Sequence, residues 1–193
     1  MSIRTGTRFR YGAVAQVFHW LTAALVATAY LSTPGGSEQR AYSVAFDFTR
    51  EFHETTGMLV VAIVLLRVLW RSTDSTPEAP PMAPWMKLAA TLTHCALYAL
   101  LIAIPSTAIL GAWWEGHALT LLGGLTFAPM LAQAHDLGAT VADIHTYLGN
   151  AIIWLAGLHA VAALFHHFVL RDRVLLSMLP DWPPLRAQWL RRA

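Results

Sequence analysis

The stretch that decides the fold is the last long apolar run of the chain, residues 145–170, which reads HTYLGNAIIWLAGLHAVAALFHHFVL. It is longer than the roughly 20 residues that a helix needs to cross a bilayer. His145 and His159 are fourteen positions apart, so on a helix both side chains leave the same face, roughly 21 Å apart along the axis. Imidazole in hydrocarbon is costly unless its nitrogens find partners, so two histidines at two depths predict two stacked metal centres.

The composition predicts an integral membrane protein. Hydrophobic residues make up 56% of the 193 residues and charged residues 12%, about half the charged fraction of ordinary soluble domains. The isoelectric point is near 9.0, but the basic residues lie at the ends of apolar segments, so the charge does not indicate a nucleic-acid partner. A single cysteine, Cys95, excludes an intramolecular disulfide and a cysteine-ligated iron–sulfur cluster within the chain.

Four apolar segments predict one all-α transmembrane domain over residues 1–193, a four-helix bundle in contact with membrane lipid. The segments lie at about 13–31, 52–70, 88–113 and 145–170. Residues 32–51 are expected to form a loop with an interfacial piece near 42–48, and residues 72–86, which carry four prolines, an irregular link. Residues 115–144 are expected to form a short amphipathic or surface-lying segment.

The basic residues predict that both termini face the cytoplasm. Eleven Lys and Arg residues flank the N-terminus, the second connection and the C-terminus, whereas Arg40 and Arg50 alone lie on the opposite side. Cytoplasmic loops of membrane proteins carry the excess of Lys and Arg, so the side with eleven is assigned to the cytoplasm.

With this orientation, four histidines fall into two pairs at matched depths. His53 and His145 lie near the outer side, and His19 and His159 lie towards the cytoplasm. Each pair takes one histidine from each of two helices, which is the arrangement that clamps a flat macrocycle in a helix bundle. A lone histidine in a membrane is as often a hydrogen-bonded packing residue, but four in two matched pairs favour ligation.

The other histidines are assigned different roles. His94 lies at ligand depth without a spare partner, and we expect it to donate to a haem propionate, a quinone carbonyl or a backbone group. His166 follows His159 by one heptad and is the main rival ligand, but it and His167 should lie near the cytoplasmic headgroups. Two more belong to the outer loop and should be solvated or line an outer cavity: His117 and His135.

Several motifs resemble the prokaryotic cytochrome b561 family, and the resemblance covers residues 11 to about 180. The motifs are Phe18-His19-Trp20, His53-Glu54-Thr55-Thr56-Gly57, Arg67-Val68-Leu69-Trp70-Arg71, His94 with Tyr98, His145 with Leu148-Gly149, and Gly157-Leu158-His159 with Ala162-Ala163 and His166-His167. Members of this family are small four-helix di-haem cytochromes of the bacterial inner membrane, of the superoxide:quinone oxidoreductase type. They are distantly similar to the cytochrome b subunits of nickel–iron hydrogenases.

The resemblance implies two b-type haems with bis-histidine iron, one held by His19 and His159 and the other by His53 and His145. It also implies a multi-pass inner-membrane protein that exchanges electrons with ubiquinone or ubiquinol. An iron held by two histidines has no open coordination position, so outer-sphere electron transfer is favoured over oxygen activation, and no separate catalytic residue is expected.

Three further residues are candidates for contact with the macrocycles. Gly57 and Gly149 each follow a proposed ligand by four residues and could let a macrocycle approach the helix backbone; ordinary helix–helix packing is the alternative. Arg67 could pair with a propionate of the cytoplasmic-side haem, or its side chain could simply extend to the membrane surface.

The donor of electrons is left open by the sequence. A positive outer surface would attract superoxide, but the outer segments carry two arginines against seven acidic residues: Glu38, Asp47, Glu51, Glu54, Glu115, Asp136 and Asp143. A periplasmic redox protein is therefore an equal candidate. Two other classes remain, a haem-bearing membrane-anchor subunit for a larger dehydrogenase or hydrogenase and a haem-free metal-ion carrier, and homodimerisation is also open.

Overall fold

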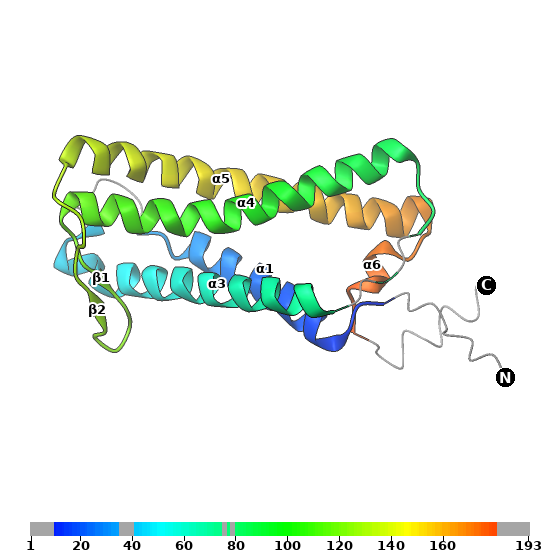
Figure 1. Cartoon of the computed structure of the whole chain (residues 1–193), viewed down its shortest axis with the longest axis horizontal. Helices are drawn as coiled ribbons and strands as arrows, with labels where there is room; N and C mark the ends of the chain where they lie inside the picture. Colours follow the sequence, from blue (N-terminus) through cyan, green and yellow to red (C-terminus); the bar gives the residue numbers. More distant parts are fainter. Residues whose placement is uncertain (1–9, 35–40, 75–76, 78–79, 181–193) are drawn as a thin grey trace.

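Four long helices make up most of the computed structural model, which describes residues 10–34, 41–74, 77 and 80–180. They are α1 (Ala13–Leu31), α3 (Asp47–Thr73), α4 (Pro84–Glu115) and α5 (His135–Phe165), and they lie side by side along the molecule (Figure 1). Each is long and apolar enough to span a membrane. The prediction of a helical membrane bundle with four apolar helices is confirmed.

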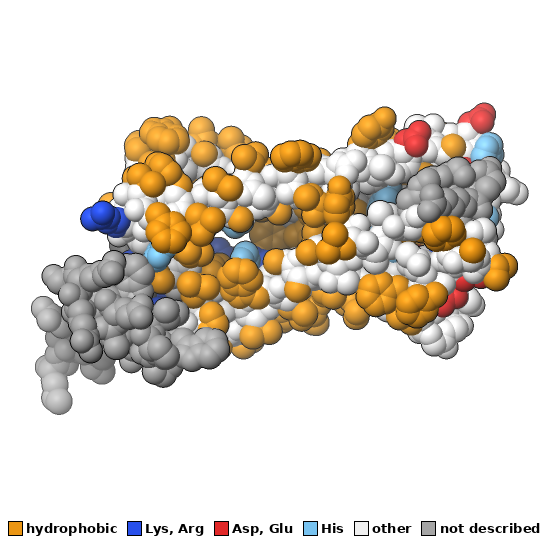
Figure 2. All heavy atoms as spheres, turned by 180° about the vertical axis from the view of Figure 1, so that it is seen from behind, with side chains coloured by type: hydrophobic (Ala, Val, Ile, Leu, Met, Phe, Trp, Pro, Cys, Tyr) orange, Lys and Arg blue, Asp and Glu red, His pale blue; other side chains and the backbone are white. Residues whose placement is uncertain are grey.

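The bundle consists of two helix pairs. α1 packs along α3 and α4 packs along α5, whereas contact between the pairs is mainly between α3 and α4 and is much less extensive. The buried core that joins the pairs is small and consists of Val60, Val64, Leu101 and Ile152. Most other large apolar side chains face outward, as Figure 2 shows over the length of the helices, which suits a lipid environment.

Short elements close the two ends of the bundle. At one end, the 3-10 turn η1 (Val44–Phe46) precedes α3, and β1 (Leu119–Thr120) pairs with β2 (Thr126–Phe127) in an antiparallel hairpin between α4 and α5. We call this the hairpin end. At the opposite, terminal end, α5 continues as the π-helical turn η2 (His166–Leu170), and α6 (Val174–Ser177) follows.

At the terminal end, hydrogen bonds join the end of α6 and the residues after it to α1 and the residues before it. The Tyr11 N–H donates to the Ser177 carbonyl at 3.1 Å, and the buried Gln16 amide donates to the carbonyls of Ser177 and Leu179 at 3.3 and 3.1 Å. The Trp20 indole N–H donates to the Met178 carbonyl at 2.9 Å. The first and last described segments therefore lie at the same end of the bundle.

Two connections differ from the prediction. The expected loop 32–51 ends earlier, because α3 begins at Asp47, where Arg50 forms ion pairs with Asp47 and Glu54 one turn away on either side. The expected surface-lying segment 115–144 is instead the β-hairpin followed by the first turns of α5, which begins at His135 rather than near His145. Hydropathy marks only the part of a helix that lies in lipid, so polar first turns are missed.

Candidate functional site

Two histidines from different helix pairs lie close together towards the hairpin end. His53 lies on α3 and His145 on α5, and their ring centres are 6.2 Å apart with the ring planes nearly perpendicular. Both line one cavity together with Leu119 of β1. The structure therefore brings together the outer pair that the depth argument predicts.

Backbone carbonyls orient both of these imidazoles. His53 Nδ1 lies 2.8 Å from the Ala29 carbonyl oxygen, and His145 Nδ1 lies 2.9 Å from the Ile104 carbonyl oxygen. A carbonyl can only accept, so Nδ1 carries the proton in each ring and Nε2 keeps its lone pair. Ala29 belongs to the last turn of α1, where carbonyls have no intrahelical partner. This is the usual way in which a protein fixes a metal-binding histidine.

The cavity between the two helix pairs has a volume of about 310 Å³. It is bordered by Gly57 and Gly149, and a Cβ atom built on either glycine would meet no atom within 4 Å. Neither glycine is therefore in close contact with a neighbouring helix, which disfavours the packing alternative. Tyr30 of α1 donates from its hydroxyl to the Asn150 side-chain oxygen of α5 at 3.0 Å, and both residues line the cavity.

A second histidine cluster lies farther towards the terminal end. His19 of α1 and His159 of α5 have ring centres 6.3 Å apart. His94 of α4 lies closer still to His159, with 5.3 Å between ring centres. The inner pair that the depth argument predicts is thus assembled, and His94 joins it as a third imidazole. His145 and His159 share α5, so the two clusters lie roughly 21 Å apart along it.

Both predicted pairs have the spacing that a shared metal requires. A metal bound by two opposed imidazoles, with about 2 Å to each nitrogen, holds the ring centres about 6 Å apart. The pairs His53–His145 and His19–His159 match this spacing at 6.2 and 6.3 Å, whereas His94–His159 is shorter at 5.3 Å. Position and spacing together favour His19 over His94 as the partner of His159.

Arg67 of α3 lies beside the terminal-end cluster. Its guanidinium carbon is 5.4 Å from the centre of the Tyr98 ring, and its charge interacts with His19, His94 and His159. Within the described part of the chain, no carboxylate forms an ion pair with Arg67. A cation among three imidazoles fits a ligand that brings its own carboxylate, such as a haem propionate.

The rival histidine His166 already has a partner. Its Nδ1 lies 2.5 Å from Asp172 Oδ2, and the other Asp172 oxygen accepts the Val174 N–H at 2.9 Å. His166 therefore helps to fasten the turn between η2 and α6. This bond leaves Nε2 free, as at His53 and His145, so it is the position of His166 in η2, beyond α5, that disfavours it as a ligand. The role in the turn was not predicted from the sequence. A histidine six residues before an aspartate at a helix end could have indicated such a contact.

The histidines of the hairpin end outside the cavity also have partners. His135 Nδ1 lies 2.6 Å from Glu115 Oε2, and this interaction joins the start of α5 to the end of α4. The His117 ring stacks on the Tyr42 ring with 3.5 Å between ring centres. His167, beyond α5 at the other end, lies edge-on to Phe168 at 4.8 Å.

The arrangement fits a flat metal-bearing ring better than a bare metal ion. No group of three or more His, Cys, Asp or Glu side chains with metal-binding geometry occurs among the described residues. Each predicted histidine pair can supply two nitrogens and leaves the other coordination positions to the ligand. A macrocycle supplies these positions itself, and the open space in front of Gly57 and Gly149 is where its plane can enter.

Comparison with known proteins gives matches over most of the chain. The family model described as prokaryotic cytochrome b561 matches residues 10–181. Cytochrome b561 homolog 2 of Escherichia coli K12 is 31% identical over 176 residues, which cover 91% of this chain and 94% of that protein. The Probable superoxide oxidase CybB of Yersinia pestis is 31% identical over 174 residues, 89% of this chain and 96% of that protein. Cytochrome b562 of Cereibacter sphaeroides is 31% identical over 167 residues, which cover 83% of this chain and 89% of that protein.

Proposed function

This chain belongs to the prokaryotic cytochrome b561 family, and we propose that it carries electrons across the bacterial inner membrane through two b-type haems. Family membership makes it a multi-pass membrane protein that binds b-type haem. The number of haems and their ligands are part of the proposal, which assigns one haem to His53 and His145 and the other to His19 and His159. The observation that carries it is the presence of two histidine pairs with ring centres 6.2 and 6.3 Å apart.

The side chains of this protein would hold and tune the haems. A b-type haem supplies a reversible one-electron change at its iron. His53 and His145 would bind through Nε2 because their Nδ1 protons are committed to the Ala29 and Ile104 carbonyls. Two axial nitrogens occupy both open positions of the iron, which favours electron transfer without bond formation.

We further propose that the terminal end faces the cytoplasm. In the described residues this end carries the basic side chains Arg10, Arg67, Arg71, Lys87, Arg171 and Arg173, whereas the hairpin end carries Arg50 alone. This asymmetry is the one that the positive-inside rule describes. The hairpin-end haem would then receive electrons from the periplasmic side, and the terminal-end haem would exchange them with ubiquinone in the membrane.

Two donors are candidates for the hairpin-end haem. The similarity to a protein named a probable superoxide oxidase favours superoxide. The charge of the hairpin end favours a cationic redox protein, because its one described basic residue, Arg50, is paired with Asp47 and Glu54. Further acidic residues lie at this end: Glu51, Glu115, Asp136 and Asp143. Figure 2 shows acidic side chains, in red, at this end of the molecule. A negative surface repels superoxide and attracts a positively charged protein.

A haem count on the purified full-length protein tests the proposal. We expect a reduced-minus-oxidised spectrum with the sharp bands of b-type haem and two haems per chain. A spectrum without haem bands would support the haem-free metal-ion carrier, and one haem per chain would contradict the two-site assignment. Copurification with a large soluble subunit would instead identify a membrane-anchor role within a dehydrogenase or hydrogenase.

A further inference from the structure

We propose that the β-hairpin, residues 119–127, is a cover over the hairpin-end haem, and that Glu54 and Thr55 act as positioning residues that hold it closed. In this proposal the cover sets the redox potential of that haem and its access to small water-soluble reductants. The inference rests on the proposed function, since it needs a haem between His53 and His145.

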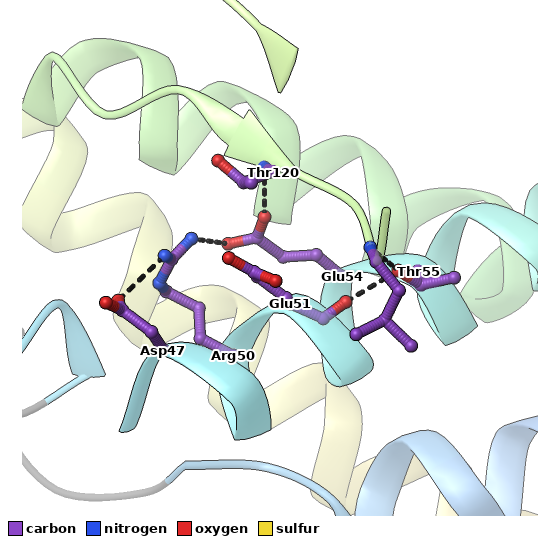
Figure 3. A network of polar contacts seen from close by, with 7 residues as sticks. Asp47, Arg50, Glu51, Glu54, Thr55 and Thr120 are labelled. Carbon is purple, nitrogen blue, oxygen red and sulfur yellow. Dashed lines mark hydrogen bonds and ion pairs between the residues drawn. The ribbon is translucent and has the colours of Figure 1, made fainter. Parts of the chain in front are cut away.

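Two hydrogen bonds fasten the hairpin to α3. The Thr120 N–H donates to Glu54 Oε2 at 2.5 Å, and the Leu122 N–H donates to Thr55 Oγ1 at 2.8 Å (Figure 3). Alternate residues of a strand present their N–H groups on the same edge. The N–H groups of Thr120 in β1 and of Leu122 just after it point away from β2. Their hydrogen-bond acceptors are side chains of α3 and not another strand.

The two acceptors are themselves held in place. Glu54 also accepts from Arg50 at 3.1 Å, and Arg50 donates to Asp47 at 3.0 Å, which gives the chain of contacts drawn in Figure 3. The Arg50 and Glu54 side chains are only 13% and 11% exposed. The Thr55 hydroxyl donates to the Glu51 carbonyl at 2.6 Å, which leaves its oxygen directed to accept from Leu122. Charge-assisted bonds of this kind resist displacement.

The contacts between the hairpin and α3 lie next to the proposed haem site. Glu54 and Thr55 directly follow the proposed ligand His53 on α3. Leu119 of β1 is 7% exposed and lines the same cavity as His53 and His145. The hairpin therefore places an apolar side chain in the wall of the cavity at its water-facing end.

Covering a haem changes its redox potential by a known mechanism. The oxidised haem carries one more positive charge than the reduced haem, and water stabilises that charge, so exclusion of water raises the potential. Opening the hairpin should then lower the potential of the hairpin-end haem and leave the terminal-end haem unchanged. It should also speed the reduction of the hairpin-end haem by a small hydrophilic reductant.

The hairpin turn offers a precise way to remove one of the two hydrogen bonds. The Gly124 N–H donates to the Leu121 carbonyl at 3.0 Å, so Leu122 and Gly123 are the central residues of a turn, and Gly123 has φ = +91°. A turn with positive φ at its third residue commonly has proline at its second. Leu122→Pro should therefore remove the N–H that binds Thr55 while preserving the turn.

The test compares Leu122→Pro and Thr55→Val with the wild type, each as the full-length haem-loaded protein in lipid nanodiscs. We expect faster amide exchange in residues 119–121, a downward shift of the midpoint potential of one haem only, and faster reduction of that haem by ascorbate. Thr126→Ala is the matched control, because Thr126 is an exposed hairpin residue that makes neither of the two bonds to α3. It should change none of the three quantities.

Each other outcome has a distinct meaning. Faster amide exchange with both potentials unchanged would overturn the redox role of the cover. Equal shifts of both haems would overturn its assignment to the hairpin end, and unchanged exchange in both variants would overturn the cover itself. A wild-type protein without haem would contradict the proposed function, which is a separate result because the haem count is measured before the variants are compared.

Discussion

At the scale of single residues, the hydrogen bonds at Nδ1 make the hairpin-end histidines suitable ligands. His53 and His145 could be selected from the sequence because histidine is rare and costly in an apolar segment. Their partners, the carbonyls of Ala29 and Ile104, could not, because every residue has a carbonyl and only the fold decides which one an imidazole reaches. The third imidazole at the other cluster, His94, was placed at the right depth, but its 5.3 Å separation from His159 required the structure.

Gly57 gives the first prediction at this scale. Gly57→Leu should remove the hairpin-end haem, because the new side chain enters the open space beside His53 that the macrocycle would occupy. The haem count should fall from two to one while the protein stays folded. The control is Gly157→Leu, at another glycine with open space before it, which does not line the cavity of His53 and His145. Retention of both haems in Gly57→Leu would contradict the placement of the macrocycle.

Arg67 gives the second prediction. Its positive charge disfavours the oxidised state of a nearby haem, so Arg67→Gln should lower the midpoint potential of the terminal-end haem by an amount on the order of 1 kcal/mol. The hairpin-end haem should keep its potential. Arg71→Gln is the comparison, since Arg71 lies one turn farther along α3, over the Tyr11 ring, and should give a smaller shift. A larger shift in Arg71→Gln, or a rise in Arg67→Gln, would contradict the assigned role of Arg67.

At the scale of elements, hydropathy located the four helices but not their ends. α1 was predicted with its observed bounds, since its apolar run is bordered by Gly12 and Ser32. α3 and α5 begin earlier than predicted, because their first turns carry charged side chains that ion pairs or solvent accommodate. The β-hairpin was not predicted, because its strands are two residues each and it is held by side chains of α3, which is distant in sequence.

The junction of α4 and α5 gives a prediction about stability. A Cβ atom on Gly138 would lie 2.5 Å from Glu115 Oε1 and 2.8 Å from two other Glu115 atoms. Glu115 is buried and bonded to His135, so it can move only by breaking that contact. Gly138→Ala should therefore destabilise the protein by about 1–2 kcal/mol, although alanine normally favours a helix.

Gly157→Ala is the matched control for this substitution. Gly157 lies on the same helix with open space before it, so the added methyl should stabilise the helix by up to about 1 kcal/mol. Thermal unfolding of the two variants in the same detergent measures the difference. A higher melting temperature for Gly138→Ala than for Gly157→Ala would show that Glu115 does not hold the two helices together.

At the scale of the whole molecule, the important property is that two tightly packed helix pairs contact each other little. The space between them holds four predicted ligands, two from α5 and one each from α1 and α3. The sequence indicated this arrangement because the spacing of His145 and His159 on one helix defines two depths. It could not indicate the cavity of about 310 Å³ or the open space in front of Gly57 and Gly149, because both depend on how the helix pairs pack.

The charge of the hairpin end gives the prediction at this scale. Reduction by a cationic electron-transfer protein such as reduced horse cytochrome c should be faster than by an anionic one of similar potential, and it should slow as salt is added. Glu51→Gln combined with Asp143→Asn should reduce the cationic protein's rate constant several-fold and leave the potential of the terminal-end haem unchanged. Fast reduction by superoxide with a rate that salt does not change would favour superoxide as the donor instead.

The most direct test of the account is a haem count, with assignment of the remaining haem by its potential, for single His→Ala variants at the four proposed ligands and His94. We predict that His53→Ala and His145→Ala each lose one and the same haem, and that His19→Ala and His159→Ala each lose the other. His94→Ala should keep two haems. Loss of different haems within a pair, or loss of the terminal-end haem in His94→Ala but not in His19→Ala, would contradict the assignment.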